Sequence, residues 1–219
     1  MRILYVRRTA CAAVSRDILT LKNTSAAGFC PDRGTEGNAS QLKTTNKVRF
    51  LALSAVIAAL YAVLTYAAAA MNLAYGPFQF RFSEALTVLP AFTPAAIPGL
   101  AIGCLLSNLA SPLGIVDWVF GTLATLLASL CTYMLRNIRW KEIPILAPLP
   151  PVLFNALIVG LEIACLSEAG SFGWGNASLA GFVSGAVSVG VGELVVCFAL
   201  GIPLMIAIKR TKLSQFMLV

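Results

Sequence analysis

The sequence predicts an all-α membrane protein, a bundle of six transmembrane helices with both termini in the cytoplasm. The chain is 58% hydrophobic and only 11% charged, whereas an ordinary soluble domain is about a quarter charged. No charged residue occurs within 50–80 or within 85–116, and each stretch exceeds the ~20 residues with which a helix crosses a bilayer. The positions of the basic residues then decide how many spans there are.

Residues 1–46 stand apart from this hydrophobic pattern. The opening MRILYVRR is followed by a weak apolar patch that SRD interrupts, which makes a poor signal peptide. The polar, turn-rich tract at 23–46 is expected to be disordered. We interpret 1–46 as a disordered extension or as the product of a start codon assigned too early. The membrane domain is expected over 47–212, followed by a short tail at 213–219.

Four hydrophobic stretches each predict one span, at roughly 48–70, 115–135, 144–166 and 179–208. The stretch 85–116 is harder to interpret. At 1.5 Å per residue it would extend about 48 Å, which is too long for one helical span and short for two. Pro90, Pro94 and Pro98 interrupt its first half.

Charge parity resolves the number of spans. Basic clusters lie at 47–49, 136–141 and 209–212, and basic loops prefer the cytoplasm. An even number of spans must therefore separate each pair of clusters. This predicts two short spans in 85–116, with a turn near Thr93 and Pro94. The outer loops are then 71–83, 110–114 and 167–178, and Arg81 is their one basic residue.

The composition also excludes several classes of function. The chain has no His, which removes the commonest metal ligand and the commonest general base. It has no CxxC pair and no P-loop motif. The net charge of +7 is concentrated beside hydrophobic segments rather than along a groove for phosphates. We therefore expect no enzyme activity, no metal, no bound cofactor and no nucleic-acid partner.

Ionisable residues inside a membrane are costly and mark function by default. Six polar side chains are predicted to form a pocket toward the outer side: Glu84, Asn108, Asp117, Asn155, Glu162 and, deeper, Glu193. Each of the outer ones also has a structural alternative. Glu84 and Asp117 suit the first turns of helices, Arg81 is able to pair with Glu84, and Glu162 is able to snorkel to the interface. Glu193 is too deep for that and must pair or line a cavity.

The first predicted helix carries small residues at helical spacing. The pairs Ala55/Ala59 and Ala58/Ala62 let a neighbouring helix approach closely. Spacing alone favours packing inside the bundle slightly over contact with another protein. Taken together, these features describe a binding protein or transporter for a small polar molecule. A self-sufficient secondary transporter and an intramembrane enzyme remain alternatives.

Two long strings resemble the queuosine-precursor transporter family, commonly called QueT. They are QFRFSEALTVLPAFTPAAIPGLAIGCLLSNLASPLGIVDWVFGTLATLLA at 79–128 and LAPLPPVLFNALIVGLE at 146–162, and the similarity extends over about 47–210. The resemblance implies a substrate-binding S component of an energy-coupling factor (ECF) transporter in the bacterial plasma membrane. Such a protein captures a 7-deazaguanine and works with a transmembrane coupling subunit and two ATPases. An S component for another solute, such as a vitamin, is the alternative.

The resemblance also implies roles for particular residues. The small-residue face of the first helix, Ala55, Ala58, Ala59 and Ala62, becomes the docking surface for the coupling subunit. A guanine-like edge presents two donors to a carboxylate, for which Glu162 and Glu84 are candidates, and its O6 accepts from Arg81 or Asn108. Phe78, Phe82 or Trp174 would stack on the base. Asp117 would balance the charge of an aminomethyl form. Asn155 and Glu193 complete the predicted pocket.

Overall fold

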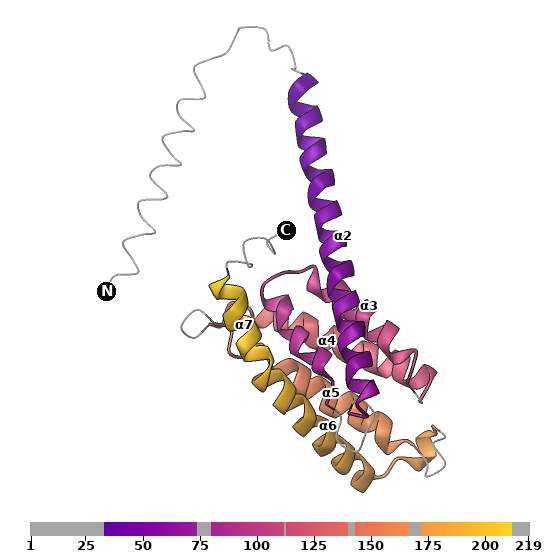
Figure 1. The fold of residues 1–219 in the computed structure, drawn as a ribbon. Helices are drawn as coiled ribbons and strands as arrows, with labels where there is room; N and C mark the ends of the chain where they lie inside the picture. The colour runs from indigo at the N-terminus through magenta and orange to yellow at the C-terminus, as the bar shows by residue number, and fades with distance from the viewer. Residues whose placement is uncertain (1–32, 74–79, 112, 140–142, 167–171, 212–219) are drawn as a thin grey trace, which may run out of the picture. The chain divides into compact units, whose positions relative to one another are not determined.

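In the computed structural model, residues 33–73, 80–111, 113–139, 143–166 and 172–211 are described. The chain divides into two compact units, 1–42 and 43–219, and the second holds the fold considered below. The described residues are helical apart from turns and one isolated bridge between Leu166 and Phe172. The elements, in order, are α2 (Arg33–Ala70), the 3-10 helix η1 (Phe82–Ala91), α3 (Ala96–Asn108), α4 (Ile115–Leu135), α5 (Leu149–Ala164), the 3-10 turn η2 (Trp174–Asn176), α6 (Leu179–Ala199) and α7 (Gly201–Arg210) (Figure 1).

Three helical stretches are long and apolar enough to cross a membrane: 45–70, 115–135 and 179–210. They correspond to three of the spans predicted from hydropathy, and the all-α class is confirmed. Two shorter apolar helices, α3 and α5, accompany them. At 1.5 Å per residue these extend about 20 and 24 Å, less than the ~30 Å hydrocarbon core. The number of spans and the location of the termini stay predictions.

The stretch 85–116 is interrupted by a turn close to Thr93 and Pro94, where the sequence predicted one. Phe92–Ala95 form a turn between η1 and α3, in which the backbone N–H of Phe92 donates to Leu89 O at 2.8 Å. The first arm, however, is a 3-10 helix rather than an α-helix, and Pro90 lies inside it. Such long 3-10 runs are uncommon. Every residue from Ser83 to Ala91 is buried, so η1 lies inside the bundle rather than against lipid.

The first helix begins earlier than the sequence predicted. α2 starts at Arg33 rather than near residue 48, and the interpretation of 1–46 as a disordered or mis-assigned extension stays a prediction. The apolar, span-like part nevertheless begins at Thr45. Residues 1–32 and the predicted tail at 213–219 lie outside the described residues, and the domain boundaries stay predictions.

The last predicted span is broken into two helices. α6 ends at Ala199 and α7 begins at Gly201, because Pro203 has no backbone N–H to continue the helical ladder. At this break the chain passes close to η1. A Cβ added to Gly201 would lie 3.1 Å from Val88 Cγ1. The missing side chain therefore lets the α6–α7 junction approach the buried 3-10 helix.

Glycines also bring the other helices close together. A Cβ on Gly103 of α3 would lie 2.8 Å from Tyr61 Cβ on α2, and a Cβ on Gly160 of α5 would lie 2.8 Å from Ala186 Cα on α6. Both distances are too short for a real contact. The helices therefore approach nearly backbone to backbone, as small residues allow in membrane bundles. The polar side chains of α2, α3, α4, α5 and α6 can then meet around η1.

Candidate functional site

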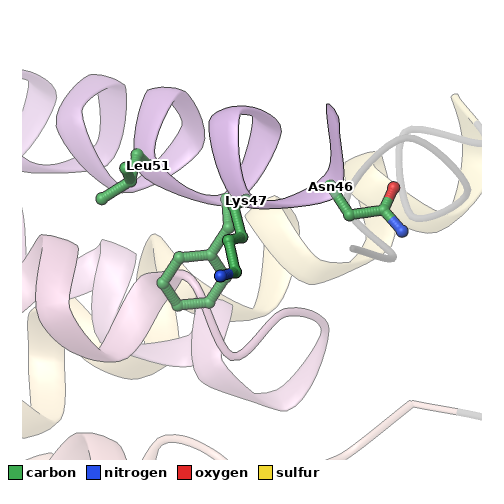
Figure 2. A pocket seen from close by; sticks show the side chains of 4 residues that line it. Asn46, Lys47 and Leu51 are labelled. Carbon is green, nitrogen blue, oxygen red and sulfur yellow. The ribbon is translucent and has the colours of Figure 1, made fainter. Parts of the chain in front are cut away.

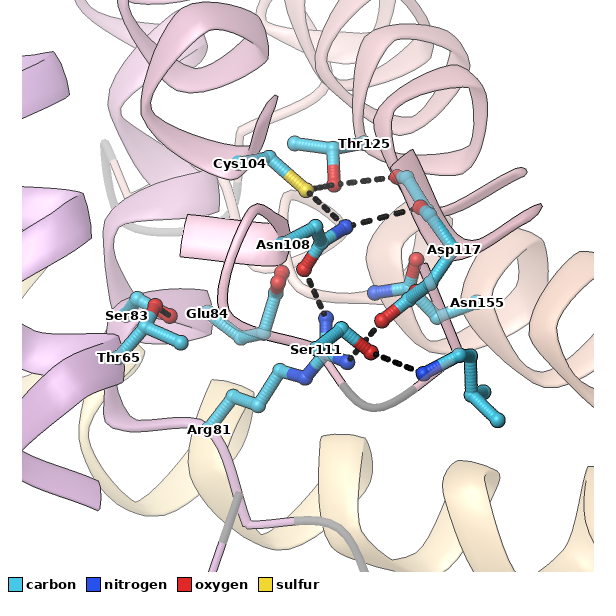
Figure 3. A network of polar contacts seen from close by, with 12 residues as sticks. Thr65, Arg81, Ser83, Glu84, Cys104, Asn108, Ser111, Asp117, Thr125 and Asn155 are labelled. Atoms are coloured by element: carbon cyan, nitrogen blue, oxygen red, sulfur yellow. Dashed lines mark hydrogen bonds and ion pairs between the residues drawn. The ribbon is translucent and has the colours of Figure 1, made fainter. Parts of the chain in front are cut away.

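Arg81 lies at the centre of a buried polar cluster. Its side chain is 8% exposed, and its Nη2 pairs with Asp117 Oδ2 at 3.6 Å. Its Nη1 donates to Asn108 Oδ1 at 3.3 Å (Figure 3). Arg81 immediately precedes η1, Asn108 ends α3, and Asp117 lies in the first turn of α4. One guanidinium thus connects three segments of the bundle.

Asn108 is held in one orientation by bonds at both ends of its amide. While Oδ1 accepts from Arg81, Nδ2 donates to the backbone O of Asp117 at 3.0 Å. Gly121 leaves the room for this arrangement, because a Cβ there would lie 2.5 Å from Asn108 Nδ2 and 2.9 Å from Asp117 Oδ1. The Arg81–Asn108–Asp117 geometry is therefore built into the contact between α3 and α4.

Glu84 links the cluster to the first helix. It is 2% exposed, and Tyr61 Oη on α2 donates to its Oε1. Next to it, Thr65 Oγ1 donates to Ser83 Oγ at 2.7 Å. Among the described residues, Oε2 of Glu84 has no hydrogen-bond partner. One carboxylate oxygen thus holds α2 against η1.

Glu193 joins the same cluster from α6. Its Oε1 accepts from Asn155 Nδ2 at 2.9 Å, and its Oε2 lies 3.5 Å from Cys197 Sγ. Asn155 also lies beside Glu84. The sequence predicted that Glu193 must either pair or line a cavity. The structure shows that it pairs, because both of its carboxylate oxygens have partners.

Glu162 is buried but has no partner. Its side chain is 1% exposed, and neither of its carboxylate oxygens has a hydrogen bond within the described part of the chain. This burial argues against snorkelling to an interface. Glu162 lies near enough to Asp117 and Arg81 to interact with both electrostatically. Buried polar atoms are almost always hydrogen-bonded, so the two open acceptors make Glu162 a candidate for contact with a ligand.

The structure therefore brings together all seven polar residues that the sequence selected. We call this set the polar site: Arg81, Glu84, Asn108, Asp117, Asn155, Glu162 and Glu193. Arg81 forms an ion pair with Asp117 and also interacts electrostatically with its sequence neighbour Glu84. Within the described chain, the polar site sets four carboxyl groups against one guanidinium.

An aromatic group contains one of the predicted stacking residues. Trp174 is 65% exposed and packs edge-on against Phe172, with ring centroids 5.5 Å apart. Phe120 lies 6.1 Å from Phe172 and 6.4 Å from Trp174. Phe82 is half-buried, and Phe78 lies outside the described residues. Sequence reasoning missed Phe120 and Phe172. The signal for Phe120 was its position one helical turn after Asp117.

The alanines of α2 do not share one environment. Ala55 and Ala59 are exposed and Ala62 is half-buried, whereas Ala58 is 5% exposed. A Cβ on Gly103 of α3 would lie 2.9 Å from Ala58 O. The inclusion of Ala58 in a partner interface was therefore wrong, because it packs inside the bundle. Contact of Ala55, Ala59 and Ala62 with a partner stays a prediction.

A hollow of about 430 Å³ lies along α2, lined by Asn46, Lys47, Phe50 and Leu51 (Figure 2). None of these residues belongs to the polar site, and the lining is mainly apolar. Within the described residues, no group of three or more His, Cys, Asp or Glu is arranged to hold a metal.

Comparison with known proteins agrees with the resemblance. Residues 51–210 match the family model described as QueT transporter. The queuosine precursor transporter QueT of Lactococcus lactis subsp. cremoris (strain MG1363) is 41% identical over 88 residues, which are 40% of this chain and 51% of the relative. The match thus spans about half the length of that relative. No solved structure matches the chain.

Proposed function

The chain belongs to the QueT transporter family, and we propose that it captures a 7-deazaguanine precursor of queuosine within the membrane and mediates its uptake with an ATP-driven coupling module. The observation that carries this proposal is the polar site. It is buried, its central guanidinium is held by two partners, and Glu162 offers two open acceptors. This pattern suits a ligand that has adjacent donors and one acceptor.

Glu162 is the carboxylate that fits the guanine edge best. That edge presents N1–H and the exocyclic amine as neighbouring donors, and a carboxylate accepts both in one plane. Glu84 already accepts from Tyr61, and Glu193 accepts from Asn155. Glu162 has both oxygens open among the described residues. Of the two candidates that the sequence left, Glu162 is therefore favoured over Glu84.

Arg81 is the better candidate for the ligand's O6. Asn108 was the alternative, but its amide oxygen accepts from Arg81 and its amide nitrogen donates to the backbone O of Asp117. The guanidinium carries five N–H donors in a rigid fork. Asn108 and Asp117 hold that fork in place. We therefore assign O6 to Arg81, with Asn108 as the residue that positions it.

We assign stacking on the ligand's ring to the aromatic group of Phe120, Phe172 and Trp174. Pockets that bind a base combine hydrogen bonds along its edge with aromatic side chains against its face. Trp174 and Phe172 belong to the segment that follows α5, and Phe120 lies on the helix that carries Asp117. We propose that one of these rings stacks on a ligand held by Glu162 and Arg81.

We propose that partner subunits supply the energy for uptake. The sequence has no P-loop motif with which to bind ATP, so ATP-driven uptake requires other chains. We propose that the protein is an S component and that α2 docks on a transmembrane coupling subunit through Ala55 and Ala59, which are exposed. Small exposed residues let a partner helix approach closely. Two ATPase subunits complete the module in the bacterial plasma membrane.

Ligand binding by the purified protein tests this function. Isothermal titration would compare 7-cyano-7-deazaguanine, 7-aminomethyl-7-deazaguanine, guanine, riboflavin and thiamine. Tight binding of a deazaguanine with weak or no binding of the vitamins is the expected result. Binding of a vitamin alone would contradict the proposal and favour an S component for another solute.

Reconstitution in liposomes tests the coupling. Uptake of the deazaguanine should require the coupling subunit, both ATPases and ATP. Uptake by the protein alone, driven by an ion gradient, would identify a secondary transporter instead. Conversion of the ligand by the protein alone would identify an enzyme.

A further inference from the structure

We infer that the hollow along α2 binds an anionic phospholipid, with the headgroup at Lys47 and an acyl chain along Phe50 and Leu51. The hollow has a volume of about 430 Å³ and is lined by these three residues and Asn46 (Figure 2). That volume lies in the range of small-ligand sites. The four residues follow one another at i, i+1, i+4 and i+5, so they share one side of the helix.

The lining of the hollow changes from polar to apolar along the helix. Asn46 and Lys47 precede Phe50 and Leu51 by four residues, or about 6 Å at 1.5 Å per residue. Figure 2 shows Asn46 and Lys47 toward one end of the hollow and Leu51 toward the other. Phe50 is half-buried and Leu51 is 66% exposed, so the hollow opens on the surface of the protein. A phospholipid has the same order, because its polar headgroup is followed by apolar chains.

The hollow also lies at the depth where a lipid changes from headgroup to chain. The part of α2 that is apolar enough to cross a membrane begins at Thr45, so Asn46 and Lys47 belong to its first turn. The ends of a span lie where the hydrocarbon core meets the headgroups. Lysine side chains at such ends extend their charge toward the headgroups. Lys47 can therefore contact a headgroup while Phe50 and Leu51 contact the chain below it.

The surroundings of the hollow are basic. Arg49 is exposed within one turn of Lys47. The last turn of α7 holds two more basic residues, and it lies beside α2, because Ile208 and Ile57 belong to one buried cluster. No Asp or Glu occurs in α7 or in 43–59. The charge of the hollow and its surroundings is thus complementary to an anionic headgroup.

This charge favours an anionic lipid over a zwitterionic one. Both kinds of lipid carry a phosphate that accepts hydrogen bonds from the ammonium of Lys47. In a zwitterionic headgroup, however, a second, positive group offsets that attraction. The basic clusters predict that this end of α2 faces the cytoplasm, and anionic lipids give the cytoplasmic leaflet its negative surface potential. Each Lys or Arg near such a surface contributes about fivefold in affinity.

Native mass spectrometry of the purified, full-length protein tests the inference. The protein in detergent would be mixed with equal amounts of phosphatidylglycerol and phosphatidylcholine that carry the same acyl chains. The ratio of the two lipids retained then reports the headgroup alone. We expect phosphatidylglycerol to be retained about fivefold more than phosphatidylcholine, or better.

Three variants locate the origin of this preference. Lys47→Gln removes the charge at the hollow and should lower the ratio about fivefold. Arg139→Gln is the matched control, because it removes an exposed basic charge from another cluster on the same predicted side, and its ratio should stay within about twofold of the unchanged protein's. Leu51→Trp fills the apolar end of the hollow and should lower the retention of both lipids. All three positions are exposed, so the melting temperatures should not fall.

Several results would overturn the inference. Retention of the two lipids within twofold of each other would show that the headgroup charge is not recognised. Equal losses in Lys47→Gln and Arg139→Gln would assign the attraction to the basic surface as a whole. Unchanged retention in Leu51→Trp would place the lipid outside the hollow. If the full chain retains no lipid but a chain that ends at Thr211 does, the tail is the occupant. The proposed function stands in each case, because none of these measurements involves the polar site.

Discussion

Arg81 and Asp117 form a buried ion pair, in which Nη2 and Oδ2 are 3.6 Å apart and both side chains are at most 8% exposed. The pair joins the segment before the 3-10 helix to the first turn of α4. Removing one member of a buried pair leaves an uncompensated charge, whereas removing both is often tolerated. The pair therefore fixes the polar site and connects parts of the chain that are distant in the sequence.

The ion pair predicts that substitutions of Arg81 and Asp117 have non-additive effects on the free energy of unfolding. Arg81→Met alone should lower the free energy of unfolding by about 3–5 kcal/mol, because Asp117 would stay buried without its counter-charge. The double variant Arg81→Met/Asp117→Leu should lose less than the sum of the two single variants. Thermal unfolding in detergent would measure all three. Additive losses would show that the pair does not act as a unit.

Glu162→Gln should weaken binding without weakening the fold. The substitution turns one acceptor oxygen into a donor group that faces the ligand's own donors. Such a mismatch costs roughly 1–3 kcal/mol, or about 5- to 150-fold in affinity. Because neither oxygen has a partner among the described residues, the melting temperature without ligand should not fall. Titration calorimetry and thermal unfolding measure the two effects separately.

A normal affinity in Glu162→Gln would move the guanine-edge role to Glu84, Asp117 or Glu193. A fall in both stability and affinity would indicate that Glu162 has a structural role instead.

Substitutions on α2 should separate binding from uptake. Ala55→Leu and Ala59→Leu add bulk to exposed positions, so the isolated protein should bind its ligand normally. Uptake with the coupling subunits should fail, because bulk blocks the close approach of a partner helix. Ligand titration and uptake in proteoliposomes measure the two activities.

Ala58→Leu is the matched control on the same helix. Ala58 is buried against Gly103 of α3, so leucine there should destabilise the isolated protein. If Ala55→Leu and Ala59→Leu unfold as Ala58→Leu does, the docking assignment is wrong.

Gly103→Ala should destabilise the contact between α2 and α3. The new Cβ would lie 2.8 Å from Tyr61 Cβ and 2.9 Å from Ala58 O, and overpacking of this kind costs about 1–3 kcal/mol. Gly175→Ala is the control, because no heavy atom lies within 4 Å of its Cβ position. Equal melting temperatures for the two variants would contradict the close packing described here.

Cysteine labelling tests the predicted orientation. In a chain whose own cysteines are replaced, Cys at Ile115 or Gly175 should react with an impermeant thiol reagent from outside, and Cys at Asn137 should not. Ile115 is 69% exposed and is preferred to Gly114, whose φ of 64° makes a side chain strained there. Labelling of Asn137 from outside would overturn the charge-parity argument.

The amino-acid sequence by itself determined the helical membrane class, the positions of the long apolar segments and the turn near Thr93. Hydropathy and charge act along the chain, so these features can be found without knowing which helices touch. The sequence also selected the members of the polar site, because an ionisable residue in an apolar segment is rare and costly wherever it lies.

The tertiary structure alone decided how those residues are used. That Arg81 pairs with Asp117 depends on how α3 and α4 pack, and Gly121 makes that packing possible. Likewise, Ala58 and Ala59 are adjacent in the sequence, but Ala58 is buried against Gly103 while Ala59, about 100° further round the helix, is exposed. Which side chain a residue pairs with, and whether a helix face is buried, depend on contacts between segments far apart in the chain. The periodicity of the local sequence carries no information about those contacts.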